Sequence, residues 1–299
     1  MMDEKKLNTL LHRDPNGEGG FEHIAPTEVE DINSGDFFLT LFNKRFALLF
    51  LPQNTSSFKM MAVGNYPEHF FQLADFLSRL QHYYQNQEKL ATNEKLPLIA
   101  FFFSSHRYAL SEPFEDKALL QKIFQIAYPE SPAFTKLHTD ILHADRPLAL
   151  TTAYPVDVQQ LLQKFFHTKK KTPFQYLMID LSVNYIRSKP SNEEHLILFF
   201  YNDYLYAIAF QEGRLSFFND FEVTACNDLI YYIQLLKNRD FNTFDFTIVE
   251  NKAFSLVFEN EPGKLNMLKD LRKEKGEAFA DGYHFKTKSI ETAAKNFLL

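Results

Sequence analysis

Two stretches of this chain have the same shape, and that repetition constrains the fold more than any other feature of the sequence. "LTLFNKRFALLF" (Leu39 to Phe50) and "FFYNDYLYAIAF" (Phe199 to Phe210) each read as two apolar strands joined by a tight polar turn. Superposing the turns pairs Asn43 with Asn202. Because Asn tolerates left-handed backbone angles, both residues are typical of hairpin turns.

The same order of elements is predicted after each hairpin. In the first half, "FKMMAV" is a third strand, a helix begins near Pro67, and "PLIAFFFS" is a further strand. In the second half, "RLSFFNDFEV" is the third strand, Thr224 caps a helix, and "FDFTIVE" follows. The sequence therefore predicts two copies of a unit built as strand, strand, strand, helix, strand.

The domain boundaries follow from composition. Residues 1–34 are polar and predict an irregular N-terminal segment, 35–171 a first domain, and 172–299 a linking helix with a second domain. The run Lys169-Lys170-Lys171 is interpreted as a solvated connector. Thr172 followed by Pro173 predicts the start of the linking helix, because Pro is well tolerated at a first helical position.

Charge and composition exclude several classes of protein. A net charge of −6 argues against a nucleic-acid-binding surface. The single Cys226 excludes an internal disulfide and a cysteine metal cluster, and it favours a cytoplasmic location. The longest apolar run, "PLIAFFF", is far shorter than the ~18 residues that a membrane helix needs. We expect a soluble protein with no membrane span, no cofactor and no metal ion.

A three-stranded meander followed by a helix and a strand is typical of a ribonuclease-H-like unit. Two such units in tandem describe an α/β protein with the actin-like ATPase architecture. The sequence also resembles a bacterial family of uncharacterised proteins, a domain of unknown function of about this length, from roughly Phe37 to Val249. Leu110 and Pro113 match a turn in its middle segment. The other matching positions are Phe218, Asn219, Thr224, Asp228, Leu229, Ile230, Tyr231 and Tyr232.

The resemblance implies an actin-like fold and no particular activity. In working actin-like ATPases the first turn of each half carries Asp-x-Gly and a hydroxyl, which bring a metal ion and backbone N–H groups to the phosphates. Here the turns read "FNKRF" and "YNDYL", and neither contains Gly. Asn43, Asn202 and Asp203 remain weak candidates for nucleotide binding, with Asp203 the only carboxylate.

Two other groups of residues have the side chains of a metal or catalytic site. "LHTDILHAD" contains His138, Asp140, His143 and Asp145, but on a strand His138 and Asp140 share a face while His143 points away, which disfavours a metal site. "SSHRYALSEP" places Ser104, Ser105, His106 and Arg107 after a buried strand. Adjacent Ser and His residues do not make a catalytic pair without a specific spatial approach.

The sequence favours a non-catalytic, actin-like protein with a degenerate nucleotide site that works by binding another protein. The alternative is a nucleotide-binding protein or ATPase of the same fold, with a diverged phosphate site in the cleft between its halves. That alternative requires Asp203 to face the cleft.

Overall fold

The computed structural model describes most of the chain and divides it into two compact units. The described residues are 20–28, 32, 34–42, 44–53, 59–88, 94–113, 116–129, 136–143, 147–187, 194–201, 204–238, 241, 243–249 and 276–278. The first unit comprises Met1–Ile141 and Ala149–Leu177, and the second comprises Leu142–Leu148 and Met178–Leu299.

The first unit is built on a six-stranded sheet with the order β1-β4-β3-β2-β5-β9. Strands β2, β3 and β4 form the predicted antiparallel meander, while β5 and β9 run parallel to β2. The bounds are β1 (Glu22–His23), η1 (Pro26–Glu28), β2 (Gly35–Phe42), β3 (Arg45–Pro52), β4 (Lys59–Asn65), α2 (Phe70–Glu88), β5 (Leu96–Phe103), α4 (Val156–Phe165) and β9 (Phe166–Pro173).

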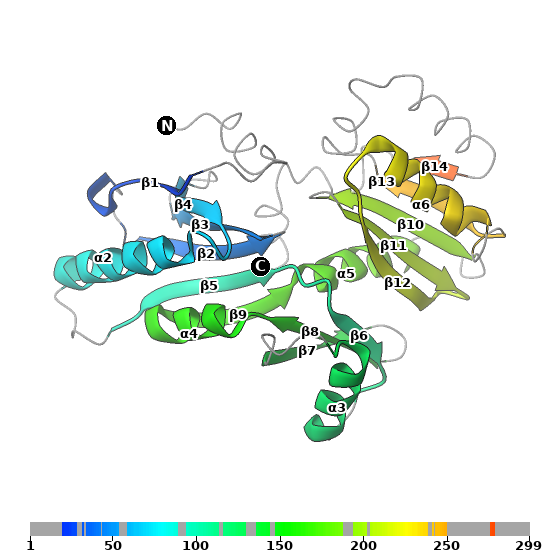
Figure 1. Cartoon of the computed structure of the whole chain (residues 1–299), viewed down its shortest axis with the longest axis horizontal. Helices are drawn as coiled ribbons and strands as arrows, with labels where there is room; N and C mark the ends of the chain where they lie inside the picture. Colours follow the sequence, from blue (N-terminus) through cyan, green and yellow to red (C-terminus); the bar gives the residue numbers. More distant parts are fainter. Residues whose placement is uncertain are drawn as a thin grey trace. The chain divides into compact units, whose positions relative to one another are not determined.

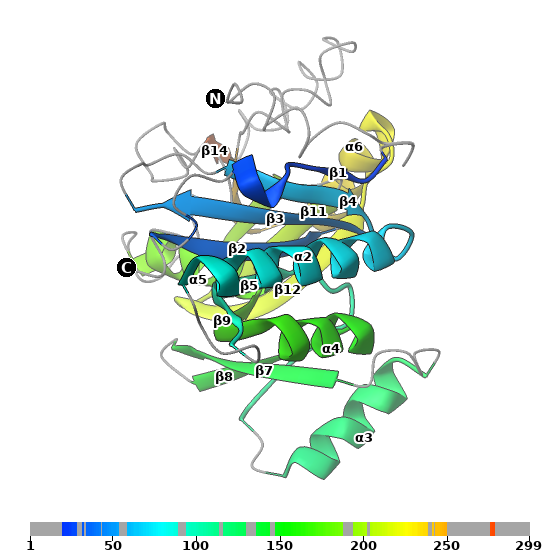
Figure 2. The same ribbon diagram turned by 90° about the vertical axis from the view of Figure 1, so that its left-hand side faces the viewer.

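Helices α2 and α4 cover one face of this sheet (Figure 2). Leu73 and Leu77 of α2 and Leu161 of α4 join the core on that face, which also contains Phe37 and Phe101. Apolar residues spaced three or four apart bring these side chains to one side of each helix, so the periodicity that predicts α2 also places its buried face.

A smaller layer is inserted between β5 and α4. It has a three-stranded sheet with the order β6-β8-β7 and one helix, α3. The hydroxyl of Tyr128 donates to the Tyr108 carbonyl at 2.7 Å and accepts from the Tyr108 N–H at 3.1 Å, which joins the end of α3 to β6. The bounds are β6 (Tyr108–Ser111), α3 (Lys117–Ala127), β7 (Lys136–His143) and β8 (Pro147–Tyr154).

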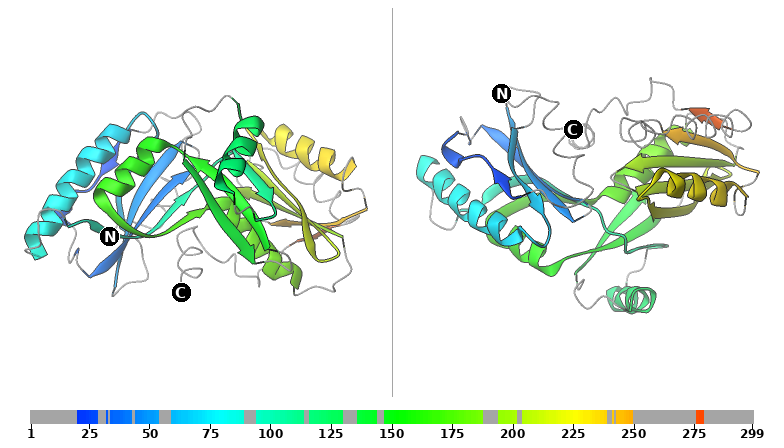
Figure 3. Two further views of the ribbon diagram at one scale, coloured as in Figure 1. Left: turned by 90° about the horizontal axis from the view of Figure 1, so that it is seen from below. Right: turned by 45° about the horizontal axis from the view of Figure 1, so that its top comes forward.

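The second unit repeats the strand order of the first. Its sheet has the order β12-β11-β10-β13-β14, with an antiparallel meander followed by a helix and a parallel strand. Figure 1 shows α6 against this sheet, and Figure 3 shows the same elements from two further sides. The bounds are α5 (Phe174–Arg187), β10 (His195–Tyr201), β11 (Tyr204–Gln211), β12 (Arg214–Glu222), α6 (Cys226–Asn238), β13 (Asp245–Val249) and β14 (Gly276–Ala278).

Two expectations for the segment between the predicted domains differ from the structure. The lysine run is not a connector, because Lys169, Lys170 and Lys171 belong to β9, an edge strand parallel to β5. Partial burial, and to a smaller extent the nearby positive charge of Lys136, lowers the pKa of Lys171. Thr172 is buried at the end of the same strand, and α5 begins only at Phe174.

The start of α6 is also organised differently from the prediction. Thr224 does not cap the helix with its own oxygen. Instead, the Asp228 carboxylate accepts from the Thr224 hydroxyl at 2.6 Å and from the N–H groups of Thr224 and Ala225. A carboxylate in the first turn is a stronger acceptor than a hydroxyl and also suits the helix dipole. These hydrogen bonds lower the pKa of Asp228.

The segment predicted to be irregular contributes β1 and η1. Glu22 and His23 pair antiparallel with Val63 and Ala62 of β4. A strand of two residues has too few positions to show a period, which is why the sequence alone did not reveal it. No helix in the described ranges is long and apolar enough to cross a membrane.

The tight approach of β2 to β3 gives a first test. Replacing Gly35 with Ala is expected to lower the free energy of unfolding by about 1 to 3 kcal/mol, the usual cost of overpacking. The new Cβ would lie 2.5 Å from the Leu51 carbonyl oxygen and 2.4 Å from the ring of Phe50. Gly20→Ala is the matched control, because no atom lies within 4 Å of its added Cβ. Equal denaturant midpoints for the two variants would contradict this expectation.

Candidate functional site

The predicted phosphate turns are two-residue hairpins. Phe42 pairs with Arg45, so only Asn43 and Lys44 join β2 to β3, and Lys44 has a left-handed φ of 62°. The carbonyl of Lys44 accepts a hydrogen bond from the N–H of Tyr66, which ties the turn to the start of α2. A bulky residue therefore occupies the left-handed position, where Gly would allow the closest approach of an anion to the backbone.

The second hairpin has the same length. Tyr201 pairs with Tyr204, which leaves Asn202 and Asp203 as the whole connection between β10 and β11. The candidates Asn43, Asn202 and Asp203 themselves lie outside the described residues, as does the orientation of Asp203 that the nucleotide alternative requires. Their role in nucleotide binding stays a prediction.

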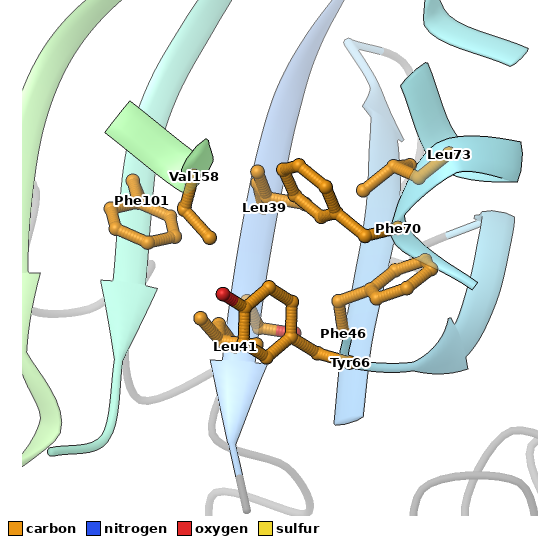
Figure 4. Close-up of a pocket in the computed structure, with 9 residues that line it drawn as sticks. Leu39, Leu41, Phe46, Tyr66, Phe70, Leu73, Phe101 and Val158 are labelled. Carbon is orange, nitrogen blue, oxygen red and sulfur yellow. The ribbon is translucent and has the colours of Figure 1, made fainter. Parts of the chain in front are cut away.

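A pocket lies beside the first turn, between the sheet and helices α2 and α4. It is nearly filled by side chains, with room for about one water molecule (about 10 Å³), and is partly open to solvent. In Figure 4 the ring of Tyr66 lies among apolar side chains from the sheet and the two helices. Its lining is Leu39, Thr40, Leu41, Phe46, Tyr66, Phe70, Leu73, Phe101 and Val158. None of these nine side chains carries a charge that could bind a phosphate.

Tyr66 links the turn between β4 and α2 to helix α4. Its hydroxyl donates to the Asp157 carboxylate, at 2.8 Å from Oδ1 and 3.0 Å from Oδ2. Asp157 stands in the first turn of α4, and its Oδ1 also accepts from the N–H of Val158 at 2.8 Å. Burial, followed by the hydrogen bond and the charge of Asp157, raises the pKa of Tyr66 far above its ordinary value of 10.0. Tyr66 is therefore a neutral hydrogen-bond donor that holds α4 in place.

The turn after β5 collects polar groups at the carboxyl ends of β5 and β9. The Ser105 hydroxyl donates to the Arg107 carbonyl at 3.1 Å and accepts from the Arg107 N–H at 3.2 Å. Gln175, at 0% exposure in α5, donates from Nε2 to the Ser105 carbonyl. The Ser105 hydroxyl and the Gln175 Nε2 group therefore bond to backbone atoms, which stabilises the turn.

The histidine and aspartate group lies on β7. His138 and Asp140 share a face, as the strand period predicts, and His138 Nε2 lies 3.2 Å from Asp140 Oδ2. The side chain of His143 and the whole of Asp145 lie outside the described residues. Within the described ranges, no three His, Cys, Asp or Glu side chains are grouped as a metal site would require.

Helix α3 carries apolar side chains on two sides. Leu120 and Phe124 are buried, whereas Leu119, Ile123 and Ile126 are exposed, with Ile126 at 80%. The exposed three are spaced i, i+4, i+7 and therefore form one row, which we call the α3 stripe. The sequence "ALLQKIFQIA" contains both rows, so helical periodicity indicates a second apolar side, but only the structure shows which side is exposed.

The similarity to a solved structure defines the class of fold. A Bacteroides thetaiotaomicron VPI-5482 protein with an actin-like ATPase fold and unknown function superposes with a TM-score of 0.56 at 13% identity, covering 90% of this chain and 98% of that chain. The chain therefore has the actin-like ATPase fold, as predicted. No curated protein matches it in a sequence search.

Two further solved structures are more distant. The PilM-PilN type IV pilus biogenesis complex matches at 10% identity with a TM-score of 0.37, covering 87% of this chain and 85% of that chain. An exopolyphosphatase from Cytophaga hutchinsonii ATCC 33406 matches at 10% identity with a TM-score of 0.31, covering 89% and 90%. At these TM-scores neither structure adds to the fold assignment.

A family model also matches the chain. Residues 44–243 match the family described as "Protein of unknown function (DUF3822)". The match covers well over half of the sequence, and the chain belongs to this family.

The bond between Tyr66 and Asp157 gives a second test. Tyr66→Phe is expected to lower the free energy of unfolding at pH 7 by about 1 to 2 kcal/mol, because a hydrogen bond to a carboxylate is lost in a partly buried site. Tyr231→Phe is the control, because the Tyr231 side chain is 59% exposed. If Tyr231→Phe lowers the free energy of unfolding as much as Tyr66→Phe does, the hydrogen bond between Tyr66 and Asp157 does not make the expected contribution to stability.

The stability difference between the wild type and Tyr66→Phe should depend on pH in one direction only. Because the folded protein raises the pKa of Tyr66, its contribution to stability is complete below the ordinary value of 10.0 and is lost as the pH rises above it. The stability difference between the wild type and Tyr66→Phe should therefore be constant from pH 7 to 9 and narrow above pH 10. Denaturant titrations at each pH measure it, and a difference that widens above pH 10 would contradict the assignment.

Proposed function

We propose that this protein is a non-catalytic, actin-like module that works by binding another protein. The observation that carries the proposal is the α3 stripe, in which Leu119, Ile123 and Ile126 remain exposed although the opposite side of the helix is buried. An apolar row of this spacing on a soluble protein is typical of a surface that receives another helix.

The chemistry of the partner follows from the residues beside the stripe. Lys122 precedes Ile123 and is exposed on the same side of α3. A partner helix with apolar residues at i, i+4 and i+7 and an acidic residue facing Lys122 would bury the stripe and pair the charge. We therefore assign the stripe to an amphipathic, acidic helix of another protein.

The degenerate nucleotide site is the second part of the proposal. It is supported by two hairpin turns of two residues each, neither of which contains Gly. Phosphates are bound mainly by successive backbone N–H groups, and such short turns offer few of them. The pocket beside the first turn is lined by uncharged side chains and favours no phosphate either.

The stripe is tested by substituting its most exposed residue. Ile126→Glu should weaken binding of a purified partner at least tenfold, because the charge would be buried against apolar surface and would repel an acidic partner. Partners are first captured on the wild-type protein, then purified, and their Kd values are measured by calorimetry. Phe71→Glu on α2 is the control, since Phe71 is as exposed as Ile126, at 83%, but does not belong to the α3 stripe.

The outcomes separate clearly. Loss of binding in Ile126→Glu with retention in Phe71→Glu supports the proposal. Equal affinities for wild type and Ile126→Glu with every purified partner would overturn it.

Nucleotide binding is tested by thermal melting. Adding Mg-ATP in large excess should leave the melting temperature unchanged, because a ligand raises it only by binding the folded state. A reproducible rise of several degrees would overturn the degenerate site and favour the nucleotide-binding alternative. In that case the shift should disappear in Asp203→Ala, since Asp203 is the only carboxylate in the two turns.

A further inference from the structure

Strand β9 carries a lysine on a face of the sheet where its neighbours are aromatic. Lys171 lies opposite Phe101 of β5, and Pro173 lies opposite Phe103. Directly opposed residues on neighbouring strands point to the same face, so the Lys171 side chain leaves the sheet beside these two rings. Both phenylalanines are fully buried in the core that α2 and α4 cover. Lys171 is therefore partly buried, which is unusual for a lysine.

The small inserted layer packs at the same place. The ring of His138 on β7 lies 5.9 Å from that of Phe103, and the ring of Tyr154 on β8 lies 4.9 Å from it. Figure 2 shows β7 and β8 beside α4 and β9. Lys136 precedes His138 by two positions on β7, so both side chains are on the face that is turned toward β5 and β9. Strand alternation thus brings Lys136 toward Lys171.

The electrostatics agree with this placement. Partial burial and, to a smaller extent, the positive charge of Lys136 lower the pKa of Lys171. A like charge disfavours the protonated form of a lysine only when it is close. Two ammonium groups, one from each strand, are therefore neighbours.

These two positive charges lack a counter-charge. The carboxylate that shares their face of β7 is Asp140, and its Oδ2 lies 3.2 Å from His138 Nε2. Among the described residues, neither Lys136 nor Lys171 forms an ion pair with a carboxylate. Like charges that are held together and partly buried destabilise the folded state, and an anion bound between them would remove that cost.

The available donors indicate the kind of anion. Phosphate is usually held by the planar fork of arginine or by successive backbone N–H groups. The group formed by Lys136, His138, Asp140 and Lys171, which we call the lysine cluster, offers ammonium groups and no guanidinium. An ammonium group is a compact point charge whose rotatable donors suit a single carboxylate oxygen. Two such groups without counter-charges match a ligand that carries two carboxylates.

We propose that Lys136 and Lys171 bind a small dicarboxylate between β7 and β9. Each ammonium group pairs with one carboxylate, and the negative charge of Asp140 keeps the ligand away from the other end of the lysine cluster. The site lies within the first unit and shares no residue with the hairpin turns or the α3 stripe. The inference therefore does not depend on the proposed function.

The ligand is tested by calorimetric titration of the full chain with succinate at fixed ionic strength. We expect succinate to bind at least tenfold more tightly than acetate, which has one carboxylate, and more tightly than inorganic phosphate. Lys171→Gln should weaken succinate binding at least tenfold. Lys164→Gln is the matched control, because it removes the same charge from an exposed position of α4, and it should leave the affinity within twofold.

The closeness of the two lysines is tested without a ligand. Lys136 is exposed, so its replacement leaves the core intact. Lys136→Glu should melt at a higher temperature than Lys136→Gln, because the introduced carboxylate pairs with the Lys171 ammonium group. In a Lys171→Gln background this difference should disappear, since the partner of the new charge is gone.

Several outcomes would overturn the proposal. Equal melting temperatures of Lys136→Glu and Lys136→Gln would mean that the lysines are not neighbours. Absence of succinate binding, unchanged affinity in Lys171→Gln, or an equal loss in Lys164→Gln would remove the site. If Lys171→Gln does not fold, Lys136→Gln replaces it in the titration, with the same tenfold loss expected. Tighter binding of phosphate than of succinate would make the assignment to a dicarboxylate wrong.

Discussion

Parallel pairing between the first strand of each meander and the strand after its helix is the constraint on which the structure depends. Strand β2 pairs with β5 in parallel, and β10 pairs with β13 in the same way. Parallel neighbours cannot be joined by a short turn, so the chain must cross over the sheet, and α2 and α6 are those crossings. The crossing places a helix on one face and makes both strands central, which is why β2 and β5 are almost entirely apolar and buried.

The pattern of the sequence was sufficient for this framework because its signals are local. Central strands read as apolar runs, and each hairpin has a polar turn of fixed length, so the order of strands and helices in both halves follows from the residues themselves. Edge strands lack that signal. Strand β9 reads "FHTKKKTP", and its lysines predict a connector where the structure has a strand. An edge strand can carry lysines because it is not buried on all sides. Thr224 is predicted to cap α6 with its own oxygen, but the Asp228 carboxylate is the stronger acceptor and takes the hydrogen bonds at the start of the helix.

Among the site residues, too, those set by local sequence are predictable and those set by long-range contacts are not. Sequence located the two turns and the shared face of His138 and Asp140, because turn length and strand period are local properties. It could not locate the bond between Tyr66 and Asp157, whose partners are 91 residues apart, or that of Gln175 with Ser105, which are 70 apart. Such contacts depend on where α4 and α5 begin relative to the sheet, and nothing near either residue encodes that position. Exposure of the α3 stripe is likewise decided by the layer on which the opposite side of α3 packs.

The two units differ most in what they do with the third strand of the meander. That strand is the outermost of the meander, because the fold adds its parallel strands on the other side of the first strand. In the first unit the chain covers the edge with residues of its own, and Phe21 and His23 complete the packing beside α2. In the second unit the described chain leaves β12 as the last strand, with Phe221, Tyr232 and Tyr231 beside it. Among the described residues, the two meanders thus differ by the short strand β1 that pairs with the third strand of the first one, while their strand order is the same.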